Sequence, residues 1–581
     1  MYTLEGKRID LNCPCAEYPT PQFRRDSYIS LNGYWEFSLD EDPVNHVNYP
    51  YGIVVPFSVE TPLSQIDQSV KKGQFMHYRK FFTLPDDFNV GRVLLHFEAV
   101  DQIADAFLNG VKIAHHEGGY LPFTVDCMEL RPGKNELLVD VIDDTSSPIY
   151  PRGKQSLKPS GIWYTATSGI WGSVWLESVP NEVIQSIKID PDYDHKQVRI
   201  RVKFEGKIKN SSIKATFAGK FIAETQLDNE GNAVLPLRSA FHPWSPETPD
   251  LYGLEVSVNN DVVHSYFAMR KFSIVEHQGH KVFGLNNKPY FLKGVLDQGY
   301  YPDGGLTPPS DLAMSNDLEL LKDLGFNMVR KHIKVENMRW YYHCDRLGLI
   351  VIQDFPNAGR PYKKLLIWTA PFFTYHFDDT KRHSLLGRKD KEGRDYFEKT
   401  MPDYVERLYN VPSIAIWTLF NEGWGQFDSV RLTQYLRSLD STRLIDSTSG
   451  WFDNGAGDFD SKHIYFRKVD MEPSKDDRIL SLSEYGAFSL MVSGHCFNEK
   501  KTSYKYFDTL ENLSDAIIKC QEEEVLPQIK KGLSVSVLTQ LSDVESETNG
   551  LITYDRKVVK VDKVGLRNAN QKLVFKEDNH D

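Results

Sequence analysis

The sequence has little cysteine, no excess of positive charge and no long hydrophobic run. Its 581 residues include six cysteines, of which only Cys13 and Cys15 are close together, so no disulfide framework is expected. The net charge of −12 disfavours nucleic-acid and anionic-membrane partners. No apolar run reaches the roughly 18 residues of a membrane span. The first residues, MYTLEGKRIDLNCPC, lack the basic head and apolar core of a secretion signal. These absences predict a cytoplasmic protein.

The first 180 residues are predicted to form β-strands. Short alternating segments, separated by turn residues, are expected as strands over 31–39, 76–84, 91–100, 105–119 and 135–143. Asn109-Gly110 between two apolar runs predicts a tight hairpin. Residues 1–180 are therefore predicted to form a β-sandwich, with Trp163 and Trp171 in its core. Residues 181–274 continue in the same style and predict a second, smaller sandwich of immunoglobulin-like size.

The pattern changes at about residue 275, where strand-like runs begin to alternate with helical ones. Eight strands are expected, over 290–295, 327–332, 349–354, 413–421, 443–449, 463–466, 478–486 and 533–541. Helices are expected over 310–325, 336–348, 395–410 and 427–440, the first capped by Ser310 and Gly325. This alternation predicts a (β/α)8 barrel over 275–581. Residues 355–394 are expected to form a long functional loop.

Polar side chains end every one of these expected strands. In a (β/α)8 barrel the active site lies at the carboxyl ends of the strands, so they are predicted to converge. They are Asp297, Arg330, His332, Asp354, Asn421, Glu422, Asp446, His463, Tyr465, Glu484, Tyr485, Gln540 and Asp543.

Glu422 and Glu484 stand out because each follows a nearly unbroken apolar run. Two carboxyl groups facing each other across a cleft are the minimum equipment for glycoside hydrolysis, with one protonated and the other ionised. Each glutamate could instead only cap a strand or pair with an arginine. The occurrence of both at opposed strands favours the catalytic interpretation.

Several motifs give the chain a family resemblance. They are LNGYWEF, YRKFF, ADAFLNGVKIAHHEGGYLPF, SGIWGSVWLE, WSPETPDLY, GFNMVRKHIKVENMRWYYHCDRLGLIVIQDF, NVPSIAIWTLFNE and SEYG. Together they resemble glycoside hydrolase family 2, the β-galactosidases, β-glucuronidases and β-mannosidases. The resemblance spans nearly the whole chain and implies a jelly roll, an immunoglobulin-like domain and a catalytic barrel.

The resemblance also implies roles for individual residues. Glu422 would be the acid/base and Glu484 the nucleophile of a retaining mechanism. Asn421 would hydrogen-bond the sugar 2-hydroxyl, Arg330 would steady the nucleophile, and His463 would line the site. From its place on the sixth strand, Tyr465 is expected to donate a hydrogen bond to Glu484 and keep it ionised.

The sequence leaves alternative roles open for several of the remaining candidate residues. His332 is expected to be a positioned polar residue rather than a base, because the two glutamates fill both proton-transfer roles. Asp354 could bind a substrate hydroxyl or cap its strand. Trp424, in Gly-Trp-Gly, could stack on a sugar or turn the loop. Asp297 is expected to contact substrate, and Gln540 would make a polar subsite floor.

Departures from the family pattern bear on the substrate. Glucuronidases of the family hold the substrate carboxylate with an Asn-x-Lys pair, whereas Glu547 and Asn549 occupy those positions here. A carboxylate would repel a uronic acid. We therefore expect an exo-β-glycosidase for a neutral sugar, with β-galactosidase favoured and β-mannosidase or another β-hexosidase as alternatives. The magnesium site of the large β-galactosidases does not carry over, so no metal and no cofactor are expected.

Other classes of function fit less well. A metal-dependent barrel hydrolase would need His-x-His after the first strand, which LKGVLDQG lacks. A non-catalytic carbohydrate-binding protein would normally lose one catalytic glutamate, and both are present. The expected partner is an oligosaccharide or another glycoside. The resemblance also suggests a homodimer or homotetramer.

Overall fold

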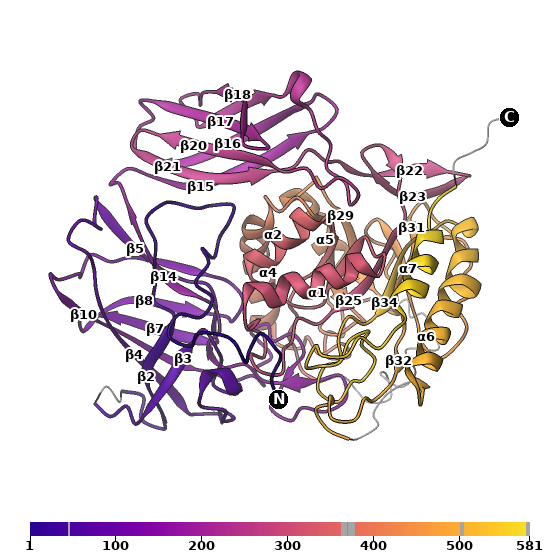
Figure 1. Cartoon of the computed structure of the whole chain (residues 1–581), viewed down its shortest axis with the longest axis horizontal. Coiled ribbons are helices and arrows are strands. Elements are labelled where there is room, and N and C mark those ends of the chain that lie inside the picture. Colours follow the sequence, from indigo (N-terminus) through magenta and orange to yellow (C-terminus); the bar gives the residue numbers. More distant parts are fainter. Residues whose placement is uncertain (45–46, 362–365, 367–368, 370–377, 500–504, 577–581) are drawn as a thin grey trace.

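The computed structural model describes the chain except for residues 45–46, 362–365, 367–368, 370–377, 500–504 and 577–581. Figure 1 shows two β-sandwiches beside a larger α/β part. Part of the predicted loop 355–394 therefore lies outside the described residues. No described helix is both long enough and apolar enough to cross a membrane.

The first sandwich has a four-stranded and a six-stranded sheet. The smaller runs β1 (Ile29–Ser30), β14 (Val174–Val179), β5 (Arg92–Phe97), β9 (Phe123–Asp126). The larger runs β3 (Tyr51–Val55), β2 (Gly33–Asp40), β4 (Phe75–Thr83), β10 (Lys134–Ile142), β7 (Ile103–Leu108), β8 (Val111–Glu117). The predicted hairpin turns between β7 and β8, with positive φ of 52° at Asn109 and 85° at Gly110.

The second sandwich packs two smaller sheets around an apolar core. One is β15 (Val183–Asp192), β16 (Gln197–Glu205), β19 (Asn232–Pro236). The other is β18 (Lys220–Thr225), β17 (Ser211–Phe217), β20 (Tyr252–Val258), β21 (Asp261–Phe267). Alternate residues of these strands face the core, which is why this region shows a period of two in its sequence.

Eight parallel strands form a nearly closed barrel. Their order is β29 (Leu444–Ser449), β28 (Ile414–Asn421), β27 (Ile350–Asp354), β26 (Met328–Lys331), β25 (Leu292–Asp297), β34 (Leu533–Thr539), β31 (Ile479–Gly486), β30 (Phe459–Ile464). The end strands β29 and β30 are also in contact. The predicted fold class of two β-sandwiches and a (β/α)8 barrel is confirmed.

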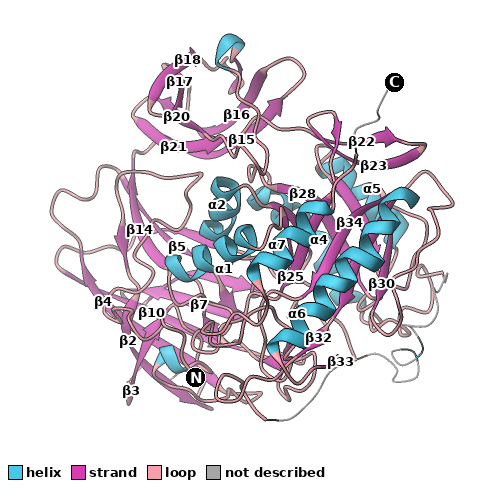
Figure 2. Cartoon of the chain, turned by 45° about the vertical axis from the view of Figure 1, so that its right-hand side comes forward, coloured by secondary structure: helices cyan, strands magenta, loops and turns pink. Residues whose placement is uncertain are grey.

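Helices pack around the barrel (Figure 2). They are α1 (Asp311–Asp323), α2 (Met338–Leu347), α4 (Lys391–Leu408), α5 (Ser429–Leu439), α6 (Leu510–Lys519) and α7 (Lys563–Lys572). The predicted cap of the first is present, since the Ser310 hydroxyl accepts from the Ala313 amide. Helix α4 begins at Lys391, inside the stretch predicted as loop.

Two details of the predicted alternation are wrong. The sixth strand spans 459–464, earlier than the expected 463–466. Its half-buried Asp460 and Lys462 form an ion pair at 2.6 Å, and this polar pair hides the strand in the sequence. Residues 450–458 and 465–478, all of them described, contain no helix between β29, β30 and β31.

A small sheet closes the amino end of the barrel. It consists of β22 (Phe272–His277), β23 (His280–Leu285) and β24 (Lys288–Pro289). Phe272 and Phe283 pack in one apolar cluster with strand residues Ile350 and Val535. The amino end is thus filled by side chains, and the polar residues gather at the carboxyl end.

Candidate active site

Strand β28 brings Glu422 to the carboxyl end of the barrel. All its residues from Ile414 to Asn421 are buried, which fixes where the strand ends. The chain then reverses through positive φ angles of 52° at Glu422, 74° at Gly423 and 68° at Gly425. The Glu422 amide donates to the Ser449 carbonyl at 2.7 Å. The Gly-Trp-Gly segment therefore turns the chain tightly and holds Glu422 at the mouth.

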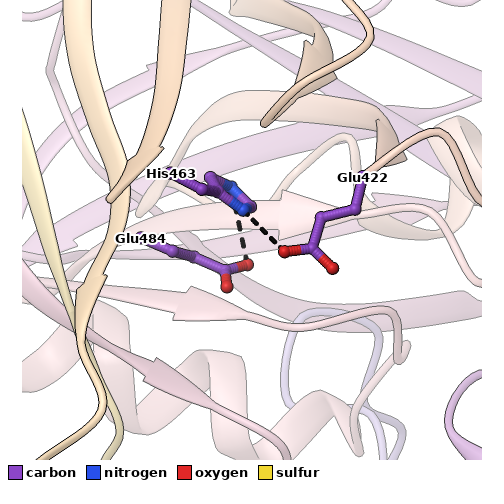
Figure 3. A group of neighbouring side chains, drawn as sticks. All are labelled: Glu422, His463 and Glu484. Carbon is purple, nitrogen blue, oxygen red and sulfur yellow. Dashed lines mark hydrogen bonds and ion pairs between the residues drawn. The ribbon is translucent and has the colours of Figure 1, made fainter. Parts of the chain in front are cut away.

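Strand β31 brings Glu484 to the same place. Figure 3 shows the carboxylates of Glu422 and Glu484 beside the ring of His463. His463 Nδ1 lies 2.9 Å from Glu422, and its Nε2 lies 3.7 Å from Glu484. One side-chain oxygen or nitrogen from each of the three lies within 4.8 Å of the others. Retaining glycosidases keep their carboxyl groups about 5–5.5 Å apart and inverting enzymes about 6.5–9.5 Å, so this spacing fits retention.

Arg330 on β26 contacts three polar side chains of the site. Its Nη1 lies 3.2 Å from the Glu484 carboxylate, and its Nη2 donates to Asn421 Oδ1 at 2.9 Å. Its Nε donates to Asp354 at 3.0 Å. Asn421 accepts through its oxygen, so its amide nitrogen is the group left to donate to a ligand. One buried guanidinium thus orients residues from three other strands.

The surroundings of Glu484 favour its ionised form. Burial would raise its pKa, but the charges of His463, Arg330 and His332 lower it below the ordinary range of glutamate. The Tyr465 hydroxyl also donates a hydrogen bond to this carboxylate. A stabilised carboxylate is what a nucleophile at this position requires.

His332 and Asp354 support Arg330. His332 Nδ1 lies 2.9 Å from Asp354 Oδ2. Burial would raise the pKa of Asp354, but Arg330 and His332 lower it overall. Burial lowers the pKa of His332. The pair therefore lies next to Arg330, and Asp354 is occupied by protein donors.

Gln540 lies at the edge of this group. Its amide nitrogen donates to Asn549 at 2.8 Å, and its oxygen accepts from Gln298 at 2.8 Å. The preceding Thr539 lies 3.3 Å from the Tyr465 hydroxyl. Gln540 is thus held in place next to Thr539, which contacts the same tyrosine hydroxyl as Glu484.

Asp297 lies apart from the catalytic group. Its carboxylate accepts from Lys331 Nζ at 2.6 Å, and Lys331 also pairs with Glu336 at 3.0 Å. Neighbouring strand residues point to opposite faces, so Arg330 points into the barrel and Lys331 out of it. Asp297 lies on the outer side with Lys331, and among the described residues its carboxylate accepts from Lys331 and from the Gly299 amide, not from a group that contacts Glu422 or Glu484.

Three other strand-end residues also have local partners. Asp446 accepts from Ser461 at 2.6 Å, and burial raises its pKa to about 6. Asp543 pairs with buried Lys560 at 2.7 Å. The Tyr485 hydroxyl donates to Gln521 at 2.8 Å. These side chains stabilise the barrel around the site.

Trp424 is packed against the first sandwich. It is 4% exposed, and its ring meets that of Trp163 edge-on at 4.9 Å. Trp163 is half-buried, so the prediction that it fills the sandwich core is wrong. Trp171 packs instead in the large apolar cluster that contains the barrel helices. Both tryptophans join the sandwich to the barrel.

Sequence reasoning missed the contribution of the first sandwich to the mouth of the barrel. Lys154, Trp163 and Tyr164 all approach it, and the Tyr164 hydroxyl donates to the Glu547 carboxylate. A lone lysine in a loop of another domain carries no pattern in the sequence. Only the adjacent aromatic pair Trp163-Tyr164 could have drawn attention to this segment.

Glu422, His463 and Glu484 are also the one group of possible metal ligands found in the described part of the chain. His463 Nδ1 already faces Glu422, and its Nε2 lies 2.9 Å from the Ser449 hydroxyl. Because both ring nitrogens are engaged by protein groups, the histidine is set to orient the carboxylates rather than to ligate a metal.

Three family models match successive parts of the chain. Residues 63–158 match "Glycosyl hydrolase 2 galactose-binding domain-like", residues 175–270 match "Glycosyl hydrolases family 2", and residues 275–558 match "Glycosyl hydrolases family 2, TIM barrel domain". The three matches agree in family and follow the order of the two sandwiches and the barrel.

Known proteins resemble the chain over most of its length. It is 25% identical to a β-galactosidase of Leuconostoc mesenteroides over 83% of this chain and 46% of that protein. The matches span about half or less of the length of such curated relatives. A β-D-glucuronidase structure from Dictyoglomus thermophilum aligns with a TM-score of 0.75, 19% identity, and 96% and 99% coverage of the two chains. A β-galacturonidase structure from Eisenbergiella tayi aligns with a TM-score of 0.70, 18% identity, and 95% and 99% coverage.

Proposed function

The chain belongs to glycoside hydrolase family 2, and on that basis we propose that it is a retaining exo-β-glycosidase acting on a terminal neutral sugar. The observation that carries the proposal is the close approach of Glu422 and Glu484. A carboxylate oxygen of one lies within 4.8 Å of a carboxylate oxygen of the other. That spacing leaves no room for a water molecule to attack opposite the acid, as inversion requires.

The reaction follows from the two carboxyl groups. The ionised Glu484 attacks the anomeric carbon, while Glu422 transfers its proton to the departing glycosidic oxygen, and the carbon–oxygen bond to the aglycone breaks. The product is a glycosyl ester of Glu484. Glu422, now ionised, removes a proton from water, which attacks the anomeric carbon and releases Glu484 as a carboxylate.

Arg330 and Asn421 have supporting roles in both steps. The Asn421 oxygen accepts from Arg330, which directs its amide nitrogen towards the sugar 2-hydroxyl. Such a hydrogen bond strengthens in the transition state. Arg330 also neutralises the charge of Glu484 when the carboxylate is released.

Two features support a neutral sugar, with β-galactoside as the favoured substrate. Glu547 and Asn549 stand where a uronate-binding pair would be. Burial raises the pKa of Glu547 to about 6, so above this pH its negative charge would oppose a uronic acid. The curated relative from Leuconostoc mesenteroides is named β-galactosidase. β-Mannosides and other β-hexosides are the alternatives.

The test begins with nitrophenyl glycosides of β-galactose, β-mannose, β-glucose, β-glucuronic acid, β-galacturonic acid, α-arabinose and β-xylose. The highest kcat/KM is expected for the β-galactoside. Glu484→Ala should abolish hydrolysis, and azide should restore turnover with an inverted glycosyl azide as product. A Glu484→Ala variant that keeps substantial activity would overturn the assignment of the nucleophile, and a uronide as the best substrate would overturn the neutral-sugar proposal.

A further inference from the structure

Lys154 is a buried cation that the catalytic mechanism does not use. Its residue is only 9% exposed. Among the residues that the structure describes, no hydrogen bond or ion pair holds its ammonium group, which lies 5.6 Å from the centre of the Trp163 ring. A buried charge without a hydrogen-bonding partner is costly. A cation kept in such a place therefore points to a partner that arrives with the substrate.

The loop that carries Lys154 is fixed against the mouth of the barrel. The amides of Arg152 and Gly153 both donate to the Asn357 carbonyl, at 2.9 and 3.1 Å. A Cβ atom on Gly153 would lie 2.8 Å from the Ile333 carbonyl. Asn357 and Ile333 follow β27 and β26. The sandwich loop thus rests on the strand ends next to Arg330 and Asp354.

Trp163 connects Lys154 with the acid/base side of the site. The Lys154 ammonium lies 5.6 Å from the centre of the Trp163 ring, and this ring meets the Trp424 ring edge-on at 4.9 Å. Trp424 is two residues after Glu422 in the same tight turn. The cation is therefore close to the catalytic residues in space, although it belongs to another domain.

Glu547 lies beside the same sandwich segment, next to Tyr164. It is 5% exposed, and its carboxylate accepts a hydrogen bond from the Tyr164 hydroxyl. Burial raises its pKa, the Lys154 charge lowers it and the Glu484 charge raises it. Lys154 and the nucleophile are thus both near enough to act on this carboxylate. The charge of Lys154 also acts on His332.

We propose that Lys154 and Glu547 together recognise hydroxyl groups of the terminal sugar, an inference that rests on the proposed exo-β-glycosidase function. The ammonium group donates to a hydroxyl oxygen, and the carboxylate accepts from a hydroxyl. The two charges offset each other, so the pair suits a neutral, hydroxyl-rich ring. Glu547 is the element that rejects a uronic acid, and Lys154 is the cation that would bind one if Glu547 were neutral.

If Lys154 and Glu547 contact the sugar, their replacement changes which substrate is preferred. A purely structural role would not change that preference. Replacing the carboxylate by an isosteric amide leaves Lys154 unopposed. The mouth then gains a net positive charge relative to the wild type, and a substrate carboxylate is attracted instead of repelled. The gain should depend on Lys154.

The experiment measures kcat and KM of the full chain with nitrophenyl β-galactoside and β-galacturonide. The variants are Lys154→Met, Glu547→Gln, the double variant, and Lys158→Met as a matched control. Lys158 is an exposed lysine four residues from Lys154. Lys154→Met should raise KM for the galactoside on the order of tenfold to a hundredfold, the effect of losing a hydrogen bond to a charged group, with a smaller change in kcat. The control should stay within about twofold.

Glu547→Gln should raise the ratio of galacturonide to galactoside kcat/KM at least about tenfold, and adding Lys154→Met should abolish that rise. The thermal midpoint of Lys154→Met should not fall, because among the described residues the ammonium group has no hydrogen bond or ion pair to lose. An unchanged KM for Lys154→Met, a fall in its thermal midpoint with unchanged kinetics, or a uronide gain that survives the double substitution would each overturn the inference. If the wild type cleaves no neutral glycoside, the proposed function fails instead.

Discussion

The hydroxyl group of Tyr465 donates a hydrogen bond to the carboxylate of Glu484. Tyr465 directly follows β30, and Glu484 lies in the neighbouring strand β31. A hydrogen bond to the ionised form of a carboxyl group favours that form. The charges of His463 and Arg330, together with this contact, keep the pKa of Glu484 low although the side chain is buried.

Tyr465→Phe is expected to move the acidic limb of the kcat/KM–pH profile to higher pH. The folded-state pKa of Glu484 is depressed, so the nucleophile is active above it and is lost as the pH falls through it. Without the tyrosine donor that pKa rises, and activity is lost at a higher pH. We also expect kcat to fall about tenfold to a hundredfold, the value of one hydrogen bond to a charged group.

Tyr485→Phe is the matched control for this shift. Tyr485 follows the nucleophile in sequence, but its hydroxyl donates to Gln521 at 2.8 Å, away from the site. Its loss should lower the thermal midpoint and leave the pH profile in place. Equal shifts in both variants would contradict the role assigned to Tyr465.

Arg330→Lys is expected to lower kcat on the order of a hundredfold, as misplaced catalytic groups do. The guanidinium contacts Asp354, Asn421 and Glu484 at once, and a lysine cannot reproduce this fork. Steady-state kinetics with the galactoside should show a loss mainly in kcat.

Arg443→Lys separates catalysis from stability. Arg443 is equally buried and pairs with Asp440 at 3.2 Å, at the start of β29 and far from the carboxyl end. The thermal midpoint should fall in both arginine variants, whereas kcat should fall only in Arg330→Lys. A similar loss of kcat in both would mean that the Arg330 effect is structural.

Glu422→Gln is expected to make hydrolysis depend strongly on the leaving group. The amide cannot donate a proton, so aryl galactosides with poor leaving groups should lose about a hundredfold or more in rate, the typical contribution of general acid catalysis. A dinitrophenyl galactoside, which departs without help, should lose far less in the first step. Rates that fall equally for all leaving groups would contradict the acid role.

Gly423→Ala is expected to displace Glu422 and reduce kcat more than tenfold. Gly423 has φ of 74°, and a Cβ atom there would lie 2.4 Å from the Phe452 ring. Gly455 has nearly the same φ of 72° and nothing within 4 Å of a Cβ atom. Gly455→Ala therefore has the same backbone strain, about 1 kcal/mol, without the clash. Its kcat should stay close to that of the wild type, and equal losses would show that backbone strain alone is responsible.

The positions of Glu422 and Glu484 could be expected from the sequence, because each lies at or near the carboxyl end of a buried strand. Glu422 is the first residue beyond β28, whereas Glu484 lies within β31, two residues before its last residue, Gly486. The same logic misplaces β30, whose polar Asp460 and Lys462 neutralise each other in an ion pair. Polarity in a sequence does not reveal that two charges are paired.

The alternation of side chains along a strand explains why the sequence does not show which strand-end residues face the site. Arg330 and Lys331 are adjacent, yet Arg330 points into the barrel and Lys331 points out of it. Asp297 pairs with Lys331 and therefore lies on the outer side as well. The part played by Lys154 depends on how a loop of the first sandwich rests on the barrel. Contacts between residues so distant in the chain leave no periodic pattern, so they could not be predicted.

The configuration of the first sugar released tests the central claim most directly. Proton NMR can follow the anomeric signal during rapid hydrolysis of nitrophenyl β-galactoside, before mutarotation equilibrates the two anomers. With Glu422 and Glu484 as close as the structure places them, double displacement should release the β-anomer first. Initial appearance of the α-anomer would contradict the retaining mechanism and the roles assigned to both glutamates.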